Sequence, residues 1–109
     1  MAVSVIIQRT VRDEKTAALL APMIVKLRSM ATAQPGYITG QAFSCLDCEG
    51  EYMVISTWAN LEDWNLWMHK EERQAIQKKI DELLGEKTGY RYYEPIVGGI
   101  TPVFKGDAA

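Results

Sequence analysis

The fold is decided by one stretch of sequence, residues 34–64, which reads QPGYITGQAFSCLDCEGEYMVISTWANLEDW. A Pro-Gly pair at 35–36 ends any preceding helix and turns the chain. Two runs rich in β-branched and aromatic residues follow, at 37–46 and 51–58, and a short segment of turn-forming residues separates them. This pattern predicts an antiparallel β-hairpin.

The residues after the hairpin predict two helices and a final strand. Asn60, with an acidic residue three positions later, resembles a capping box and predicts a short helix at 61–69. Apolar residues at helical spacing predict a longer helix at 70–84, which Gly85 ends. Alternating residues then predict a fourth strand at 90–97.

The residues before the hairpin predict one strand and one helix. β-branched residues indicate a strand at 3–11, and apolar residues at helical spacing indicate a helix within 16–34. Pro22 interrupts this pattern, because a proline inside a helix costs about 3 kcal/mol. We therefore expect either that the regular helix begins near Ala21, with Pro22 in its first turn, or that an earlier turn kinks at Pro22. A late or irregular start is favoured.

The order of elements is β-α-β-β-α-β, which is typical of an α+β, ferredoxin-like domain with a four-stranded antiparallel sheet and helices on one face. We expect this domain to span residues 1–97 and a C-terminal tail to span 98–109. Both sides of the first strand carry large apolar side chains, so the sheet face without helices should also be covered. A second copy of the chain is the expected cover, which predicts a homodimer.

Composition excludes several classes of protein. The chain has 109 residues, which corresponds to one domain, and its net charge of −2 gives no basic surface for nucleic acid. No apolar run approaches the roughly 20 residues that span a membrane. The first residues lack the basic segment of a signal peptide, so we expect a cytoplasmic protein.

Cys45 and Cys48 form a C-x-x-C motif but are too few for a disulfide framework. A zinc site needs about four ligands, and a second pair of ligands is missing from the motif. A redox pair gains a low thiol pKa at a helix N-terminus, whereas this motif lies at a hairpin turn. We therefore expect a structural role for the pair and no metal site.

A series of motifs in order along the chain is more specific: Gln34–Gly40, Val54–Trp58, Leu61–Trp64, Trp67, Glu72–Arg73 and Ile80–Gly85. The series resembles the antibiotic biosynthesis monooxygenase family over roughly nine-tenths of the chain. The resemblance implies a dimeric α+β barrel with a pocket between sheet and helices in each subunit. It also implies an oxygenase that uses no metal or flavin, acting with dioxygen on a hydroquinone-like or polycyclic aromatic molecule.

The resemblance implies catalytic roles for Asn60 and Trp64. An indole can stack on a planar substrate, and an amide can hold its phenol or ketone oxygen. The alternative is that Asn60 only caps the helix and Trp64 only packs in the core. His69, the single histidine, could act as a general base or could be a solvated residue at a helix end.

Other residues could bind the substrate. Trp67 could flank the same pocket, the Tyr37 hydroxyl could orient a substrate oxygen, and Arg91 or Arg9 could favour a phenolate by its charge. Alternation separates Tyr90 and Tyr92 from Arg91 and Tyr93, and the sequence leaves open which pair points inward.

Two other functions are alternatives to the oxygenase. The haem-degrading branch of the family pairs an Asn on the first strand with a His on the second helix. Gln8 and Gln77 stand at the matching positions here, so haem degradation is less expected. The remaining alternative is a non-catalytic dimeric barrel that binds a small aromatic ligand.

Overall fold

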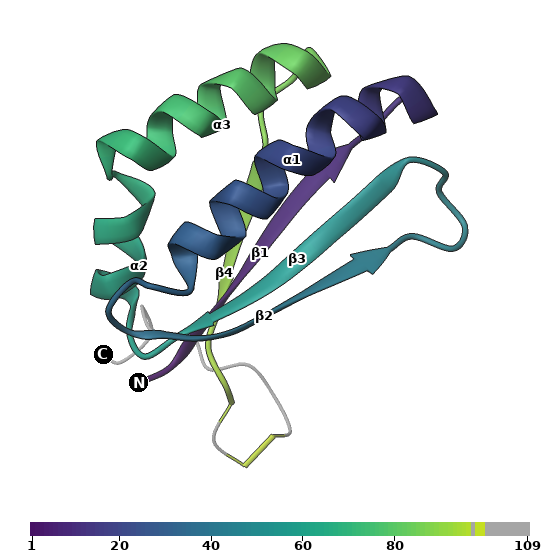
Figure 1. The fold of residues 1–109 in the computed structure, drawn as a ribbon. Helices are drawn as coiled ribbons and strands as arrows, with labels where there is room; N and C mark the ends of the chain where they lie inside the picture. Colours follow the sequence, from purple (N-terminus) through teal and green to yellow (C-terminus); the bar gives the residue numbers. More distant parts are fainter. Residues whose placement is uncertain (97, 100–109) are drawn as a thin grey trace.

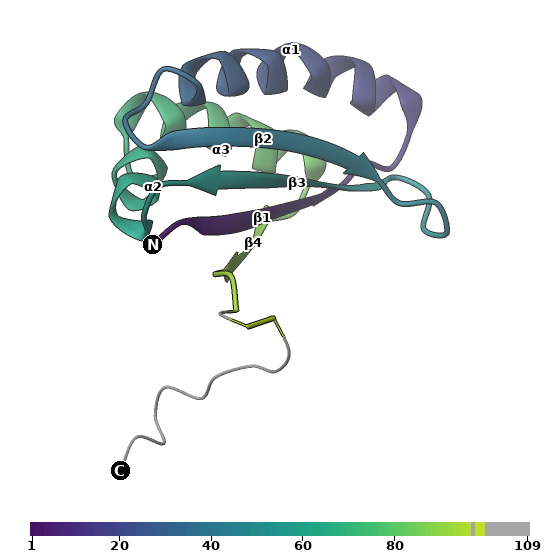
Figure 2. The same ribbon diagram turned by 90° about the horizontal axis from the view of Figure 1, so that it is seen from below.

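The computed structural model describes residues 1–96, 98 and 99, and its elements follow the predicted order (Figure 1). The elements are β1 (Val3–Thr10), α1 (Glu14–Ala31), β2 (Tyr37–Ser44), β3 (Glu51–Trp58), α2 (Leu61–Met68), α3 (Glu71–Leu84) and β4 (Gly89–Tyr93). The four strands form one antiparallel sheet in the order β2-β3-β1-β4. All three helices cover one face of this sheet (Figures 1 and 2). The predicted α+β, ferredoxin-like fold is confirmed.

The register of the strands settles which side chains face the helices. On β1, Val5, Ile7 and Arg9 are buried, whereas the residues between them are more exposed. Residues paired across antiparallel strands share a face, so Tyr90, which pairs with Ile7, and Tyr92, which pairs with Val5, also face the helices. The outer face carries Ile6, Gln8, Phe43, Met53, Ile55, Arg91 and Tyr93.

Strict alternation along β2 would place Tyr37 and Thr39 on the same face, but the structure places them on opposite faces. Tyr37 pairs with Trp58 and Thr39 with Thr57, which are consecutive residues of β3. The irregularity between Tyr37 and Thr39 therefore places them on opposite faces, as a β-bulge does. As a result the Tyr37 ring lies on the helix side of the sheet.

The predicted late start of α1 was wrong, because the helix begins at Glu14 and contains Pro22 in its interior. Asp13 caps it by accepting a hydrogen bond of 2.7 Å from the backbone N–H of Thr16, which lowers the pKa of the Asp13 carboxyl. Pro22 leaves the carbonyl of Ala18 without its helical donor. Ala18 is exposed, so water can serve as that donor.

β4 is shorter than predicted and ends at Tyr93. Pro95 follows closely and cannot donate a backbone hydrogen bond to a neighbouring strand. Val97 and nearly all of the predicted tail, 100–109, lie outside the described residues. The remaining element boundaries agree with the predictions within three residues.

The core lies between the sheet and the helices. Val5, Trp58, Trp64 and Ile80 are completely buried there. Trp58 donates a hydrogen bond of 2.7 Å from Nε1 to the Ser56 hydroxyl, so its polar atom is satisfied within the core. None of the described helices is both long enough and apolar enough to cross a membrane.

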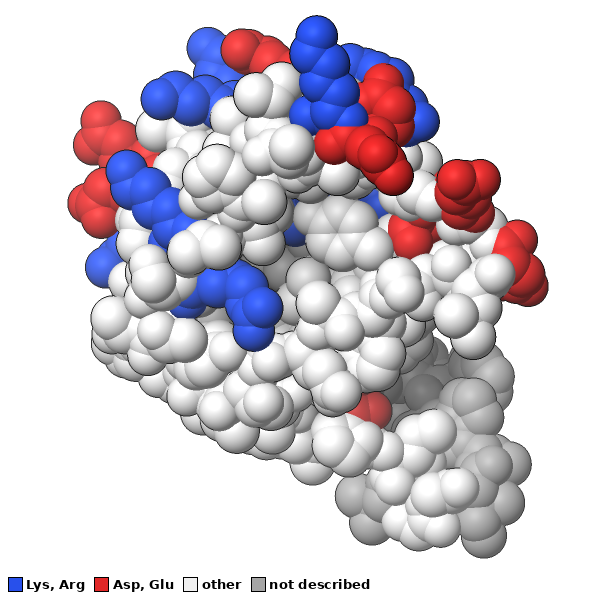
Figure 3. All heavy atoms as spheres, turned by 45° about the vertical axis from the view of Figure 1, so that its right-hand side comes forward, with Lys and Arg blue, Asp and Glu red and all other residues white. Residues whose placement is uncertain are grey.

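The surface differs between the two sides of the molecule. Figure 3 shows charged side chains crowded over the upper part, where the helices lie, whereas the lower part, formed by the strands, is nearly free of charge. No described element covers the outer face of the sheet. This face is therefore a largely uncharged surface that another molecule can cover.

The β2–β3 hairpin holds a bond that was not predicted. Cys45 and Cys48, for which we expected only a structural role, are joined by a disulfide across the turn. Glu51 N–H donates to the Cys48 carbonyl at 3.2 Å, and Cys45 N–H donates to the Glu51 carbonyl at 3.0 Å. The disulfide thus closes a turn that the backbone already forms.

Candidate active site

A small cavity lies between the sheet and the helices, with walls from β1, β2, β3 and all three helices. Its volume is about 50 Å³, which is room for one or two water molecules. Three of its lining residues are aromatic, three are arginines and none is Asp, Glu or His: the aromatic residues are Tyr37, Trp64 and Trp67, and the arginines are Arg9, Arg28 and Arg73.

The aromatic wall is fixed by contacts between rings. The Trp64 ring meets the Trp58 ring at 5.7 Å between centroids and an interplanar angle of 70°, and the Tyr37 ring meets Trp58 at 5.5 Å and 89°. Such edge-to-face contacts hold the rings in defined orientations. Trp64 is fully buried, and its Nε1 has no described hydrogen-bond partner. The indole N–H of Trp64 is therefore a buried donor without an acceptor among the described residues.

Arg73 on α3 carries a guanidinium that is buried among aromatic rings. The residue is 1% exposed, and its guanidinium carbon lies 5.3, 5.8 and 5.5 Å from the ring centroids of Trp64, Trp67 and Tyr90. Nη2 donates to the Tyr90 hydroxyl at 3.0 Å, Nη1 lies 3.2 Å from the Met68 sulfur, and Nε is unpartnered. None of these described contacts involves a carboxylate.

Arg9 on β1 is also buried but is held by a polar network. Its Nε donates to the Thr88 hydroxyl at 3.2 Å, and its Nη2 donates to the Gln77 carbonyl oxygen at 3.0 Å. Gln77 Nε2 in turn donates to Asp81 at 2.8 Å, and the Thr88 hydroxyl donates to Asp81 at 2.9 Å. The Asp81 carboxylate therefore stabilises the Arg9 cation through two neutral side chains.

The structure brings together four of the seven side chains predicted for the site. Trp64, Trp67, Tyr37 and Arg9 all line the cavity. Gly40 also lines it, and a Cβ at that position would lie 2.8 Å from the Tyr37 hydroxyl. The missing side chain at Gly40 is what leaves space for this tyrosine.

The other predicted side chains do not line the cavity. Asn60 caps α2, where its Oδ1 accepts a hydrogen bond of 2.8 Å from the Asp63 N–H. His69 is exposed at the end of α2, with Nδ1 2.8 Å from the Asn65 carbonyl oxygen. Arg91 lies on the outer face of the sheet. No observation tests their chemical roles, which stay predictions.

Arg73 was missed because it lies in a run of charged residues, Lys70 to Arg73, that is typical of a solvated surface. The spacing of residues along α3 did indicate that Arg73 is buried. Arg73, Gln77, Ile80 and Leu84 fall at spacings of three and four residues, and all four are buried. An arginine in phase with the apolar stripe of a helix predicts an inward side chain.

The positions that matter for haem binding do not offer iron ligands in this cavity. Gln8 lies on the outer face of the sheet, and Gln77 is occupied by Arg9, Thr88 and Asp81. The described cavity lining contains no imidazole. Neither position therefore supplies an iron ligand to this cavity, and haem degradation stays the less expected function.

The chain matches a family model and many solved structures. The model of the family described as antibiotic biosynthesis monooxygenase matches residues 2–79. No curated protein sequence gives a significant match.

Several solved structures share the fold. SnoaB, a cofactor-independent oxygenase from Streptomyces nogalater, is 13% identical, with a TM-score of 0.73 over 85% of this chain and 91% of SnoaB. A conserved protein from Methanosarcina mazei Go1 is 14% identical, with a TM-score of 0.76 over 85% of this chain and 91% of that protein. Rv0793 from Mycobacterium tuberculosis is 14% identical, with a TM-score of 0.76 over 88% and 96% of the two chains.

The two buried arginines should respond differently to replacement by methionine. Arg9→Met should lower the free energy of unfolding by about 1–3 kcal/mol, because it leaves the buried Gln77 oxygen without its donor. Arg73→Met should leave the free energy of unfolding unchanged or higher, because it removes a buried charge that has no described carboxylate partner. Urea unfolding of both variants measures the difference. An equal loss in the two variants would show that Arg73 serves stability.

Proposed function

The chain belongs to the antibiotic biosynthesis monooxygenase family, and from this premise we propose that it is a cofactor-independent oxygenase of an anionic aromatic small molecule. The substrate class is a phenolate, such as the anion of a hydroquinone or of a related polycyclic compound. The proposal rests on the cavity, where a buried cation and aromatic walls adjoin the same space.

The observation that carries the proposal is the environment of Arg73. A buried cation that contacts only neutral groups attracts an anion strongly, since little solvent screens the charge. A nearby guanidinium favours the ionised form of a phenol and so lowers the pKa of the phenol. The flat rings of Trp64 and Trp67 complement a planar ligand. The cavity is therefore suited to an aromatic anion.

These residues support a reaction in which the substrate supplies the electrons. The bound anion passes one electron to dioxygen, which gives superoxide and a substrate radical. The two radicals combine into a peroxide at a ring carbon. The peroxide anion takes up one proton, equivalent to the one that the substrate lost on ionisation, and then loses water to leave a carbonyl. Counted from the keto tautomer of the phenol, a ring CH₂ group and O₂ become C=O and H₂O. The protein binds the anion, orients it and excludes bulk water.

The absence of a base from the described lining restricts the substrate. No Asp, Glu or His lines the cavity, so the substrate should enter as an anion or lose its proton to water under the influence of Arg73.

Asn60 uses only Oδ1 in capping α2, and we propose that its amide N–H₂ donates to a substrate oxygen near the cavity.

Binding requires the cavity to enlarge. Sites for small molecules usually measure about 300–1,000 Å³, whereas this one is about 50 Å³. Arg28 is an exposed member of the lining, and the half-buried Tyr37 ring lies over Gly40. We propose that these two side chains move aside when the ligand enters.

Oxygen consumption by the metal-free protein with a panel of hydroquinones and anthrones tests this function. Arg73→Met should lower kcat/KM by about 10–100-fold, which corresponds to the loss of one charge-assisted hydrogen bond of about 1.5–3 kcal/mol. Lys79→Met removes a positive charge from an exposed position on the same helix and should retain the activity.

Each result has a defined meaning. Equal losses in Arg73→Met and Lys79→Met would contradict a role for Arg73 within the cavity. A panel compound that binds to the wild type while no compound causes oxygen consumption would favour the non-catalytic aromatic-binding barrel.

We also propose that two copies associate through the outer face of the sheet and form a dimeric α/β barrel. Ile6, Met53 and Ile55 lie side by side there on β1 and β3, and no described element covers them. The lower, strand-formed surface in Figure 3 is nearly uncharged, and uncharged apolar patches of this kind commonly mark interfaces.

Ile55→Lys should convert the dimer into a monomer, because it places an ammonium at the centre of the outer face. Leu66→Lys makes the same kind of change on α2, where Leu66 is 69% exposed, and should leave the dimer intact. Sedimentation velocity of the wild type and both variants measures the assembly state. A wild type that sediments as a monomer at all concentrations would contradict the proposal.

A further inference from the structure

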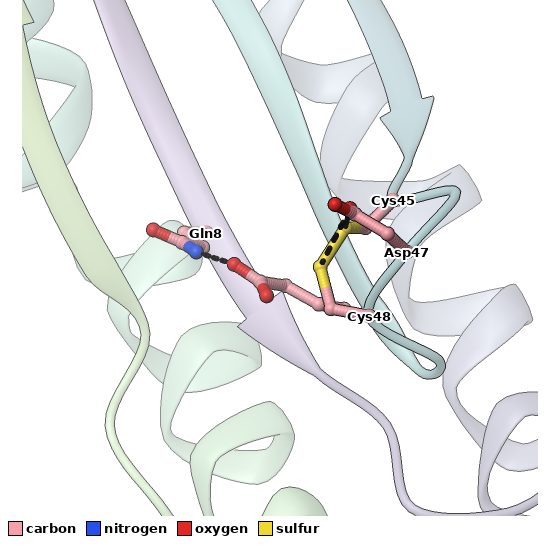
Figure 4. The surroundings of a disulfide bond; sticks show 5 residues. Gln8, Cys45, Asp47 and Cys48 are labelled. Atoms are coloured by element: carbon pink, nitrogen blue, oxygen red, sulfur yellow. Dashed lines mark hydrogen bonds between the residues drawn. A yellow bond between two sulfur atoms is a disulfide. The ribbon is translucent and has the colours of Figure 1, made fainter.

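The β2–β3 hairpin gathers sulfur and oxygen atoms at one point on the surface (Figure 4). Cys45 and Cys48 are joined by a disulfide, and both residues are half-buried. The Asp47 Oδ1 lies 3.2 Å from the Cys45 sulfur and 3.9 Å from the Cys48 sulfur. Glu51, the first residue of β3, places a carboxylate oxygen within 4.8 Å of both sulfurs.

The Glu51 carboxylate is held in place from a neighbouring strand. Gln8 on β1 donates a hydrogen bond from Nε2 to Glu51 Oε1 (Figure 4). This bond ties the side chain to the face of the sheet beside the cysteines. Orientation by such an outer partner is typical of side chains that bind metal ions.

The charge of the hairpin favours a cation. Residues 45–51 contain Asp47, Glu49 and Glu51 but no Lys or Arg. Reduction of the disulfide adds two thiols, which become anionic when they bind a metal ion. The reduced hairpin therefore brings three anionic donor groups together, the two thiolates and the Glu51 carboxylate.

We propose that the reduced hairpin binds one thiophilic divalent cation, with Zn²⁺ as the best fit, and that the disulfide closes this site. The protein ligands are the two cysteine sulfurs and the Glu51 carboxylate, and a water molecule takes the fourth position. Zn²⁺ prefers four ligands in a tetrahedron and accepts thiolate and carboxylate donors, and two cysteines separated by two residues are common in zinc sites. The C-x-x-C motif alone lacks a second pair of ligands. The folded hairpin supplies one of them as the Glu51 carboxylate, and water supplies the other.

The two states are connected by ordinary thiol chemistry. A dithiol reductant transfers two electrons and two protons to the Cys45–Cys48 bond, which breaks into two thiols, and the reductant becomes a disulfide. Zn²⁺ then displaces the two thiol protons and binds both sulfurs as thiolates. Oxidation of the thiolates would release the ion.

The site is independent of the proposed oxygenase. None of the residues 45–51 lines the cavity between sheet and helices. Metal binding is therefore measured directly on the protein, and its failure would leave the proposal for the cavity untouched.

Titration with Co²⁺ and then Zn²⁺ under anaerobic conditions tests the proposal on the full chain. After reduction by a dithiol and removal of the reductant, the wild type should bind one equivalent of Co²⁺. Binding should produce a thiolate-to-cobalt absorption band, and Zn²⁺ should displace the band. The oxidised protein should show no such band. Binding by the oxidised protein, or none by the reduced protein, would overturn the proposal.

Glu51→Gln and Glu49→Gln form a matched pair, because each removes one negative charge from the same hairpin. Changes to outer-shell residues cost roughly 10–100-fold in metal affinity, so losing the Glu51 ligand should weaken Zn²⁺ binding at least about tenfold. Glu49→Gln should leave the affinity unchanged, since Glu49 is outside the cluster. Equal losses in the two variants, or undiminished binding by Cys48→Ser, would contradict the ligand assignment.

Discussion

The buried guanidinium of Arg73 is the feature on which the proposed site depends. Burying a charge costs free energy unless other interactions offset the lost hydration. The described contacts of this guanidinium are the rings of Trp64, Trp67 and Tyr90, the Tyr90 hydroxyl and the Met68 sulfur. These contacts leave Nε unpartnered and provide no opposite charge. Such an arrangement costs stability unless an anion completes it, so a function for the cavity explains why the residue is there.

The fold brings these groups together from distant parts of the sequence. The short helix α2 follows β3 directly and presents both tryptophans to the sheet, while α3 carries Arg73 and β4 brings Tyr90 beside β1. The Arg9 network joins β1 to α3 and to the residues before β4. The Arg9 network thus helps to fix the position of α3, the helix that carries Arg73. The cluster of Cys45, Cys48 and Glu51 lies outside this arrangement, and the hydrogen bond from Gln8 on β1 connects it to the rest of the sheet.

The sequence predicted most of the fold because its strongest signals are local. The Pro-Gly turn, the cap at Asn60 and the helical spacing each act within a few residues. Pro22 was misplaced because the cost of an interior proline falls when the freed carbonyl reaches water. The bulge after Tyr37 left no signal in the alternation. In the aromatic wall, Trp64 was predicted from the family resemblance, and Trp67 and Tyr37 from their residue types and positions. Arg73 was not predicted, because its neighbours in sequence are charged whereas its neighbours in space are aromatic.

The central claim is that the cavity favours an aromatic anion through Arg73. The most direct test is the pKa of a bound phenol whose absorbance reports its ionisation, such as 4-nitrophenol, measured with the wild type and with Arg73→Met. The account predicts that binding to the wild type lowers the pKa of the phenol by about one unit or more, and that Arg73→Met abolishes this shift. A bound phenol whose pKa is raised, or is lowered equally by both proteins, would contradict it.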